Sequence, residues 1–367
     1  MKKLILEPSF PPVRTEIVFA RHLQRSEFFI QVCHGIAKRG AVLADSNVIV
    51  PFAERLQKTL GPEFSLVSVP GGEASKTRAM KEKLEDDLLK KKIGRDSLLI
   101  GMGGGVVTDL VGYLASTYMR GVPLVLIPTT LLGMVDAAIG GKTGVDTAYG
   151  KNQIGAFYFP KAIFIDVDLL STLPQKEWVN GLAEITKYGL IADGSIWDLL
   201  EKNPQNWRSP EILERLVLDS IQTKVSVVEK DPIEQTGLRR ILNCGHTVGH
   251  ALELLANFSL DHGQAVAIGC IAESYLSHHL GYLSKDDLER IRKLYAQLGF
   301  ALKWPLHLSK EAFINAMSID KKSENGEIRS VLIERIGKCL PFNGAYCRTL
   351  KRDEIDAMVQ WMEIHYR

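Results

Sequence analysis

The stretch Ser97-Leu-Leu-Ile-Gly-Met-Gly-Gly-Gly-Val-Val-Thr-Asp109 is the part of the chain that most strongly indicates its fold. The segment Ser97–Gly101, apolar at its centre, predicts a buried strand. The glycines predict a tight turn, and the periodicity of Val106–Tyr118 predicts a helix. Glycines in such a turn let backbone N–H groups approach a pyrophosphate, and the helix N-terminus adds a favourable dipole. Val106 replaces the third glycine of G-x-G-x-x-G, and the P-loop lysine is absent. Taken alone, the stretch fits a tight structural turn as well as it fits a phosphate-binding loop.

Strands and helices alternate on both sides of this stretch. Short apolar runs predict strands at Phe28–Val32, Ala41–Asp45, Phe64–Val69, Pro123–Ile127 and Ala162–Asp166, and helical spacing predicts helices at Val50–Leu60 and Thr77–Lys91. Such alternation is typical of βαβ units that build a mostly parallel sheet. Ligands bind at the carboxyl ends of the strands of such a sheet. Asp45, Gly101–Gly105 and Pro128–Thr130 are therefore candidate site positions.

The pattern changes near Asp166, after which it is almost wholly helical to about residue 320. Ser171-Thr-Leu-Pro174 predicts the first helix start there, with a capping hydroxyl and a proline in the first turn. The later elements predicted are helices at Glu211–Glu229, Gln264–His279 and Asp353–His365, and a strand at Ile328–Glu334. We therefore predict an α/β domain with a mostly parallel sheet over residues 1–170 and an all-α domain over residues 171–367.

The overall composition excludes several classes of partner. The 367 residues include 45 basic and 43 acidic ones, so no global field attracts nucleic acid or an anionic membrane. No apolar run approaches the length of a membrane span, and the one after the N-terminal lysines is too short for a signal peptide. The five cysteines are odd in number and never spaced as C-x-x-C, which favours a reducing compartment. We expect a cytoplasmic protein that binds neither nucleic acid nor a membrane.

A short window of the chain, residues 243–262, contains three of the nine histidines. His246 and His250 are four residues apart, so a helix would present them on one face. A bare H-x-x-x-H is more often a pair of packed or capping histidines, and the Glu of H-E-x-x-H is missing here. A third histidine, His262, favours a metal site, since three protein ligands with an open fourth position are typical of catalytic zinc.

A carboxylate for the same site is available in Gly181-Leu-Ala-Glu-Ile-Thr-Lys-Tyr188. Glu184 and Lys187 are three residues apart on one helix face, where a surface ion pair is the more common arrangement. If Glu184 instead faces His246 and His262, the three side chains form a His₂Glu catalytic metal site.

Two further turns support a dinucleotide site. Gly71-Gly-Glu-Ala-Ser-Lys76 is a second glycine turn after a strand, and it carries a Glu and a Lys. Asp45 and Asn47 stand at the end of another strand, where their side chains can bond ribose hydroxyls or adenine. A lone Asp at a strand end is more often a helix cap. Together with the turn at 101–105, these residues favour a bound dinucleotide.

Cationic and amide side chains recur beside glycines. Gly140-Gly-Lys-Thr-Gly144 and Gly150-Lys-Asn-Gln-Ile-Gly155 are predicted as loops, and in either loop alone a solvated lysine is the more common role. Seven such side chains lie next to glycines, metal-ligand candidates or the domain boundary: Arg120, Lys142, Lys151, Asn152, Lys187, Arg239 and Lys321. This concentration fits a substrate that carries both a phosphate and a carboxylate.

From about Asp45 to Lys322 the chain resembles the 3-dehydroquinate synthase family, through the motifs GGGVVTDL, TYMRGVPLVLIPTTLL, GGKTGV, GKNQIGAFY, GLAEITKYGLI, GLRRILNCGHTVGHALE and HGQAVAIG, in this order. The resemblance implies an N-terminal nucleotide-binding domain, a helical metal-binding domain and usually a homodimer. It also implies tightly bound NAD⁺ and one zinc per subunit, which cobalt can replace. The implied zinc ligands are Glu184, His246 and His262, which leaves His250 for proton transfer near the substrate phosphate.

The resemblance also assigns the remaining contacts residue by residue. NAD contacts fall on Asp45, Asn47, Glu73, Lys76, Gly104, Gly105, Val106, Asp109, Thr129, Thr130, Asp136, Lys142, Lys151 and Asn152. Substrate contacts fall on Asp136, Lys142, Lys151, Asn152, Lys187, Arg239, Asn243, His246, His250, His262 and Lys321. Arg120 is implied to reach the substrate phosphate, from its own subunit or across the dimer.

The activity that the resemblance implies is the second step of the shikimate pathway. In it, 3-deoxy-D-arabino-heptulosonate 7-phosphate becomes 3-dehydroquinate and phosphate. The steps are transient oxidation by NAD⁺, β-elimination, re-reduction and intramolecular aldol closure, so the enzyme is a carbon–oxygen lyase. Oxidation comes first because the ketone acidifies the neighbouring C–H whose proton is lost as phosphate leaves.

Some positions depart from the family pattern. Gln264 stands where a Glu usually follows His-Gly, which puts the charge around the preceding metal ligand in question. Asp261 replaces a residue that is commonly apolar, and Thr108 replaces a glycine of the turn. An apparent one-residue insertion leaves open whether Glu234 or Gln235 faces the site.

Three other functions compete with this one. An NAD- and metal-dependent alcohol or polyol dehydrogenase shares the architecture, but a neutral polyol does not need the cations Lys142, Lys151 and Arg239 or the amide of Asn152. Another sugar-phosphate cyclase, one that makes an inosose or a valiolone, acts on a substrate without a carboxylate. A nucleotide-binding scaffold without turnover does not need a complete metal triad.

Overall fold

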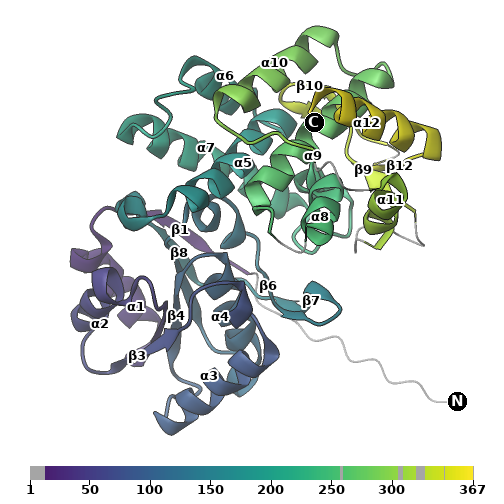
Figure 1. The fold of residues 1–367 in the computed structure, drawn as a ribbon. Helices are drawn as coiled ribbons and strands as arrows, with labels where there is room; N and C mark the ends of the chain where they lie inside the picture. Colours follow the sequence, from purple (N-terminus) through teal and green to yellow (C-terminus); the bar gives the residue numbers. More distant parts are fainter. Residues whose placement is uncertain (1–12, 257–258, 305–308, 320–326, 343, 367) are drawn as a thin grey trace, which may run out of the picture. The chain divides into compact units, whose positions relative to one another are not determined.

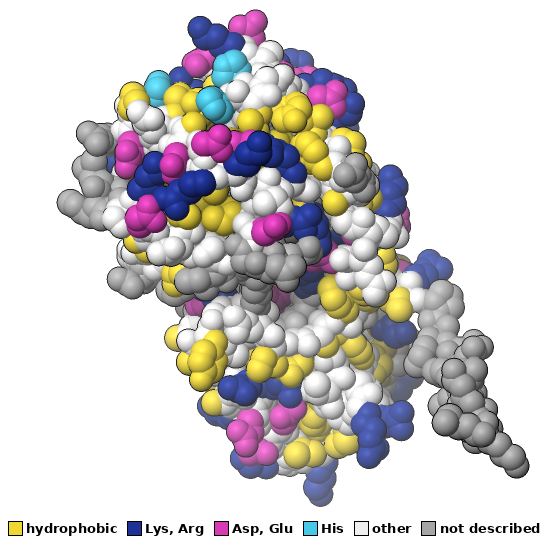
Figure 2. Space-filling view, turned by 90° about the vertical axis from the view of Figure 1, so that its right-hand side faces the viewer, with side chains coloured by type: hydrophobic (Ala, Val, Ile, Leu, Met, Phe, Trp, Pro, Cys, Tyr) yellow, Lys and Arg dark blue, Asp and Glu magenta, His cyan; other side chains and the backbone are white. Residues whose placement is uncertain are grey.

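The computed structural model describes residues 13–256, 259–304, 309–319, 327–342 and 344–366. The chain forms two compact units, one of Met1–Pro128 with Gly141–Asp166 and one of Thr129–Gly140 with Val167–Arg367. No described helix is both long and apolar enough to cross a membrane. On the face drawn in Figure 2, Lys and Arg side chains are interspersed with Asp and Glu, as their near-equal numbers predict.

The first unit contains a six-stranded sheet in the order β1-β8-β5-β4-β2-β3, in which neighbouring strands are parallel. Its strands are β1 (Glu16–Phe19), β2 (Gly40–Asp45), β3 (Phe64–Val69), β4 (Leu98–Gly103), β5 (Leu124–Pro128) and β8 (Ala162–Ile165). Helices α1 (Glu27–Ile36) and α2 (Glu54–Leu60) lie on one face, and α3 (Arg78–Lys90) and α4 (Gly105–Thr117) on the other (Figure 1). The strand order reverses between β2 and β4, which makes their carboxyl ends the switch point where such sheets bind ligands.

Burial explains why most of these strands could be predicted. Every residue of β4 and of β5 is buried, so these strands appear in the sequence as continuous apolar runs. The strands predicted at Ala41–Asp45, Phe64–Val69, Ser97–Gly101, Pro123–Ile127 and Ala162–Asp166 are confirmed, with small shifts at their ends. The edge strand β1 is only partly buried and was not predicted, although Ile17, Val18 and Phe19 form a short apolar run.

One predicted strand is wrong: Phe28–Val32 lies inside α1. The Ser26 hydroxyl caps this helix by accepting the Phe29 N–H at 3.2 Å. Phe29 and Cys33, four residues apart, are its buried residues and lie on one helix face. The cap and the helical spacing therefore outweigh the β-propensity of the Phe-Phe-Ile run.

The two glycine-flanked segments that we predicted as loops instead form an antiparallel hairpin of β6 (Lys142–Thr147) and β7 (Gly150–Phe157). Gly144 lies opposite Gly155 in this hairpin. A Cβ atom on Gly155 would lie 1.9 Å from the Thr143 carbonyl oxygen. The glycines therefore permit a close approach of two strands, whereas the sequence pattern suggested only loops.

The second unit is built mainly of helices, as predicted. Its described helices are α5 (Gln175–Ile191), α6 (Gly194–Lys202), α7 (Pro210–Lys230), α8 (His246–Leu255), α9 (His262–His279), α10 (Lys285–Gln297), α11 (Lys310–Ile319) and α12 (Arg352–His365). Short strand pairs add to them: β9 (Arg329–Ser330) pairs with β12 (Arg348–Thr349), and β10 (Ile333–Arg335) pairs with β11 (Lys338–Cys339). The single strand predicted at Ile328–Glu334 is thus divided between two ladders.

The helix start predicted at Ser171 is wrong by one turn. Val167–Thr172 forms a 3-10 turn, and α5 begins at Gln175 without a side-chain cap. Pro174 disfavours helical backbone in the residue before it, so the helix begins only after the proline.

The segment Thr129–Gly140 packs with the second unit although it precedes residue 170. The Tyr188 hydroxyl of α5 donates a hydrogen bond to the Asp136 carboxylate. The Lys224 ammonium of α7 donates to the same carboxylate at 2.7 Å. These charge-assisted bonds fasten the segment to α5 and α7.

Candidate metal centre and cofactor-binding residues

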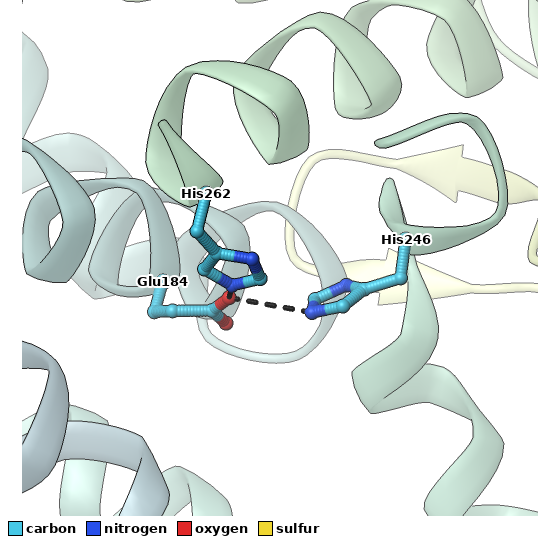
Figure 3. A group of neighbouring side chains, drawn as sticks. All are labelled: Glu184, His246 and His262. Carbon is cyan, nitrogen blue, oxygen red and sulfur yellow. Dashed lines mark hydrogen bonds and ion pairs between the residues drawn. The ribbon is translucent and has the colours of Figure 1, made fainter. Parts of the chain in front are cut away.

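Three side chains from three helices of the second unit converge on one point (Figure 3). Glu184 lies in α5 and is fully buried, and His246 and His262 are the first residues of α8 and α9. The Nε2 atoms of His246 and His262 lie 3.4 and 3.3 Å from the same oxygen of Glu184. The three candidate ligand atoms lie within 4.8 Å of one another. A single divalent cation can therefore contact all three.

Close backbone contacts bring these helices together. The Gly263 N–H of α9 donates to the Asn180 side-chain oxygen of α5 at 2.8 Å. This bond places the start of α9 about one helical turn from Glu184. A Cβ atom on Gly263 would lie 2.6 Å from the Asn180 Cα, and one on Gly269 of α9 would lie 1.9 Å from the Gly245 carbonyl oxygen. Glycines beside the ligands therefore set how closely the helices approach.

The second nitrogen of each histidine is held by a hydrogen bond. The Nδ1 atom of His262 lies 2.9 Å from a Glu253 carboxylate oxygen, and that of His246 lies 3.0 Å from the Cys244 carbonyl oxygen. A carbonyl and an ionised carboxylate can only accept, so each ring donates its Nδ1–H. When either ring is in its neutral form, as a metal ligand must be, the lone pair is on Nε2, which faces Glu184. Two such imidazoles and one carboxylate form a donor set that suits zinc or cobalt.

The charges around this point favour a cation. Burial raises the pKa of Glu184. The Lys187 ammonium and the bond to His262 lower this pKa by more than burial raises it, so the carboxylate stays ionised. Burial lowers the pKa of His262, yet its bonds to Glu184 and Glu253 raise it to about 10. Two carboxylates that share one imidazole thus create a place for positive charge, which fits a divalent metal ion.

His250 lies one helical turn after His246 in α8. Its ring centroid is 5.2 Å from that of His246 and 6.5 Å from that of His262. The group of converging ligand atoms includes His246 and His262 with Glu184 but not His250. The geometry therefore separates two histidines that face the carboxylate from a third that lies beside them.

Two buried lysines lie next to the candidate metal ligands. Lys187 pairs with Glu184 and donates to the Leu242 carbonyl oxygen at 2.7 Å. Lys224 donates to both the backbone carbonyl and the carboxylate of Asp136, at 2.5 and 2.7 Å. Burial lowers the pKa of Lys224, and the negative charge of Asp136 raises it. The positive charge of Lys187 lowers this pKa as well. An anionic ligand would relieve the repulsion between the two ammonium groups.

Arg239 is also buried in the second unit. Its Nη2 donates to the Gly140 carbonyl oxygen at 2.9 Å. Burial lowers the pKa of Arg239, and the charge of Glu234 opposes this effect. The Glu234 carboxylate also accepts a long hydrogen bond of 3.5 Å from the Asn243 amide. Of the two residues at the insertion, Glu234 is therefore the one whose side chain interacts with Arg239 and Asn243.

Two residues of this region, Lys224 and Glu253, were not predicted. Lys224 lies on α7 among the buried residues Ile221 and Val228, and Glu253 follows the buried Leu252 in α8. Charged side chains are almost never buried without a partner. A charged residue at an otherwise apolar helix position was thus the signal in the sequence that could have identified Lys224 and Glu253.

In the first unit, predicted dinucleotide contacts gather at the carboxyl ends of β2 and β4. The Asp45 carboxylate accepts the backbone N–H and the side-chain amide of Asn47, both at 2.9 Å. A Cβ atom on Gly71 would lie 2.4 Å from the Asn47 amide nitrogen, and one on Gly103 would lie 3.1 Å from the Asp45 Cβ. Both glycine turns therefore approach Asp45 at the switch point of the sheet.

Helix α4 begins directly after the turn that follows β4. Gly104 is its N-cap residue, no side chain caps it, and Gly105 and Val106 form its first turn. The N–H groups of an uncapped first turn are suited to a pyrophosphate. Thr108 is accommodated inside the helix because its hydroxyl donates to the Gly105 carbonyl oxygen at 3.1 Å.

Five more predicted cofactor contacts lie in a charged cluster of the first unit: Glu73, Lys76, Asp109, Lys151 and Asn152. Lys76 pairs with Asp109 at 2.5 Å. Burial raises the pKa of Glu73, and Lys76 and Lys151 oppose the rise. Asp146 of β6 accepts the Asn152 N–H at 2.7 Å, which holds the hairpin turn near this cluster.

The remaining predicted residues lie in other segments. Thr129, Thr130 and Asp136 belong to the segment that packs with the second unit. Lys142 is the first residue of β6, and Arg120, with φ 67°, follows α4. Lys321 lies outside the described residues.

Two families of known sequences match adjacent parts of the chain. The 3-dehydroquinate synthase N-terminal family matches residues 66–180, and the 3-dehydroquinate synthase C-terminal family matches residues 181–323. A 3-dehydroquinate synthase from Pelobacter propionicus is 41% identical over 315 residues, which are 84% of this chain and 87% of that protein.

Solved structures show the same architecture. ValA, a 2-epi-5-epi-valiolone synthase from Streptomyces hygroscopicus subsp. jinggangensis 5008 with NAD⁺ and Zn²⁺ bound, has a TM-score of 0.86 and 28% identity, covering 98% of this chain and 99% of that one. A glycerol dehydrogenase from Schizosaccharomyces pombe has a TM-score of 0.62 and 20% identity, covering 97% of this chain and 92% of that one. The second likeness shows a shared fold only.

Proposed function

The chain belongs to the 3-dehydroquinate synthase family, and we propose that it converts 3-deoxy-D-arabino-heptulosonate 7-phosphate into 3-dehydroquinate and phosphate. The observation that carries this proposal is the convergence of Glu184, His246 and His262 beside buried cations. A metal ligand set explains how an alcohol is activated. The adjacent cations explain why the substrate is an anion.

We propose that Glu184, His246 and His262 hold zinc or cobalt and that NAD⁺ binds at the switch point of the first unit. When bound, the metal polarises the substrate hydroxyl and NAD⁺ exchanges a hydride with its carbon. The ValA structure, which contains both groups, supports this assignment. The N-terminus of α4 and the cluster around Lys76 and Asp109 orient the cofactor.

The buried cations bind and orient the substrate in this proposal. Lys187 and Lys224 repel each other in the free protein, so an anionic group between them gains more than it would beside a single lysine. Arg239 and Lys142 are assigned to the substrate carboxylate, and Arg120 to its phosphate. His250, beside the metal ligands but outside their group, is assigned to proton transfer near the phosphate.

Another sugar-phosphate cyclase is the second candidate function, because the ValA structure is similar over almost the whole chain. Its identity of 28% is lower than the 41% shared with the Pelobacter propionicus 3-dehydroquinate synthase. The buried Arg239 favours the first function, because its guanidinium suits the substrate carboxylate that the substrates of the other cyclases lack.

The test compares phosphate release with the absorbance of NADH at 340 nm. The protein is supplied with metal, a catalytic amount of NAD⁺ and the heptulosonate phosphate. We expect phosphate to equal the substrate consumed over many turnovers, while net NADH stays near zero. NADH that accumulates with substrate consumption would instead show a dehydrogenase. Faster turnover of a heptose phosphate that lacks the carboxylate would favour the other cyclases.

We also propose a homodimer in the cytoplasm. All five cysteines are free and buried, which fits a reducing compartment. The dimer follows the family resemblance. Light scattering of the purified protein tests it, and a monomer at assay concentration would contradict it.

A further inference from the structure

Glu253 is a buried carboxylate that belongs to neither the candidate ligand group nor the predicted substrate contacts. It lies in α8, seven residues after His246, and its carboxylate oxygen is 2.9 Å from the Nδ1 atom of His262. On the opposite edge of the same ring, Nε2 lies 3.3 Å from Glu184. The His262 imidazole is thus held between a carboxylate on the ligand side and a second carboxylate behind it.

The neighbouring position Gln264 does not provide this contact. Its side-chain oxygen accepts the Ala301 N–H at 2.8 Å, so it supports the segment after α10. Gln264 stands two residues after His262 in α9, where most family members are expected to have a Glu. The only carboxylate that the described structure places on the Nδ1 edge of His262 is therefore Glu253.

We infer that Glu253 is a positioning residue of the metal centre, which fixes the orientation and tautomer of His262 and strengthens it as a ligand. This inference rests on the metal site of the proposed function. An acceptor on Nδ1 forces the proton to that atom and leaves Nε2 to bind the metal. An ionised acceptor also places electron density on the ring, which makes Nε2 a better donor.

The two histidines differ in this respect. His246 donates its Nδ1–H to the backbone carbonyl of Cys244, at 3.0 Å, whereas Nδ1 of His262 faces the Glu253 carboxylate at 2.9 Å. A backbone carbonyl orients a ring but adds no full charge to it. The group behind His262 is thus a side chain, and this side chain can be substituted without altering any ligand atom.

The experiment measures the dissociation constant for Zn²⁺ or Co²⁺ by competition with a chelator, without substrate. Glu253→Gln keeps the size of the side chain and removes its charge. We expect metal binding weaker by about 10- to 100-fold, as for outer-shell partners of metal-binding histidines generally. The absorption bands of bound Co²⁺ should also shift, because the field at the metal changes.

Gln264→Ala is the matched control. It lies closer to His262 in sequence and loses a hydrogen bond to Ala301, so its melting temperature should fall. Its metal dissociation constant should stay within about twofold of the wild type. Equal loss of metal affinity in both variants would show a merely structural effect and would overturn the inference, as would an unchanged affinity in Glu253→Gln.

A measurement on the unsubstituted protein keeps the inference testable if Glu253→Gln does not fold. In protein labelled with ¹⁵N-histidine and loaded with ¹¹³Cd²⁺, the metal should couple to Nε2 of His262, and Nδ1 should carry a proton. Coupling to Nδ1 would overturn the inference. Failure of the proposed reaction looks different: the metal still binds through Nε2, but phosphate is not released from the heptulosonate phosphate.

Discussion

Replacing Lys224 by Met tests whether the buried charge cluster serves both the fold and the substrate. Lys224 donates to the Asp136 carbonyl and carboxylate at 2.5 and 2.7 Å, and its side chain is only 7% exposed. Met has a similar length and apolar stem, so the substitution removes the charge with little loss of packing.

The expected loss of stability follows from what Asp136 retains. Removing one partner of a buried ion pair costs about 3–5 kcal/mol. Asp136 is 28% exposed and keeps the hydrogen bond from Tyr188, and Met avoids the cost of burying an ammonium group. We therefore expect the free energy of unfolding to fall by about 2 kcal/mol, near the net value of a charged hydrogen bond.

The loss should depend on pH with a defined sign. Burial raises the pKa of Asp136, but Lys224 and Lys187 lower it well below its ordinary value. A lowered folded-state pKa contributes stability above the ordinary carboxyl pKa of about 4, and this contribution disappears as the pH falls through the folded value. The difference between wild type and Lys224→Met should therefore be full near neutral pH and shrink in acid.

Urea unfolding at several pH values measures the stability, and phosphate release measures the effect on substrate. Truncating one charge that faces an anion costs about 2–5 kcal/mol, so kcat/KM should fall about 30-fold or more. Lys230→Met, on the exposed end of the same helix, is the control and should change neither quantity. Wild-type stability and wild-type kcat/KM in Lys224→Met would refute the reasoning.

Three further predictions concern the metal centre and the cofactor site. His262→Ala should leave the protein folded but poor in metal, and full metal occupancy measured by atomic emission would contradict the ligand assignment. Gly269→Ala should lower the free energy of unfolding by about 1–3 kcal/mol, because its Cβ would lie 1.9 Å from the Gly245 carbonyl oxygen. Thermal denaturation with and without metal measures this, and an unchanged melting temperature would show that the helix contact is loose. The Lys76→Met variant loses the ion pair with Asp109 and should bind NAD⁺ about 10-fold or more weakly, as measured by calorimetry. Unchanged NAD⁺ affinity would place the cofactor elsewhere.

The sequence by itself determined the features that depend on local pattern. Strands such as Leu98–Gly103 and Leu124–Pro128 are apolar because both faces of the sheet are covered, so their positions are visible in the residue order. The glycine turn before α4 could also be predicted, because a tight turn needs specific residues at specific positions.

The sequence indicated the metal centre only in part. The spacing of His246 and His250 suggested a pair on one helix face, but it could not choose between His250 and the more distant Glu184. That choice came from the resemblance to a family, and the structure independently brings Glu184 to within 3.4 Å of His246. A surface ion pair was the more common arrangement for Glu184, yet the residue is fully buried.

Only the tertiary structure decided which distant side chains meet. Lys224 and Asp136 are 88 residues apart, and His262 and Glu184 are 78 residues apart, so no local pattern records either contact. The same holds for Phe28–Val32, whose β-propensity yields to a cap and to packing in α1. Local propensity contributes a fraction of a kcal/mol per residue, whereas burial of a large apolar side chain contributes about 1.5–3 kcal/mol. Tertiary contacts therefore decide the arrangement wherever the two disagree.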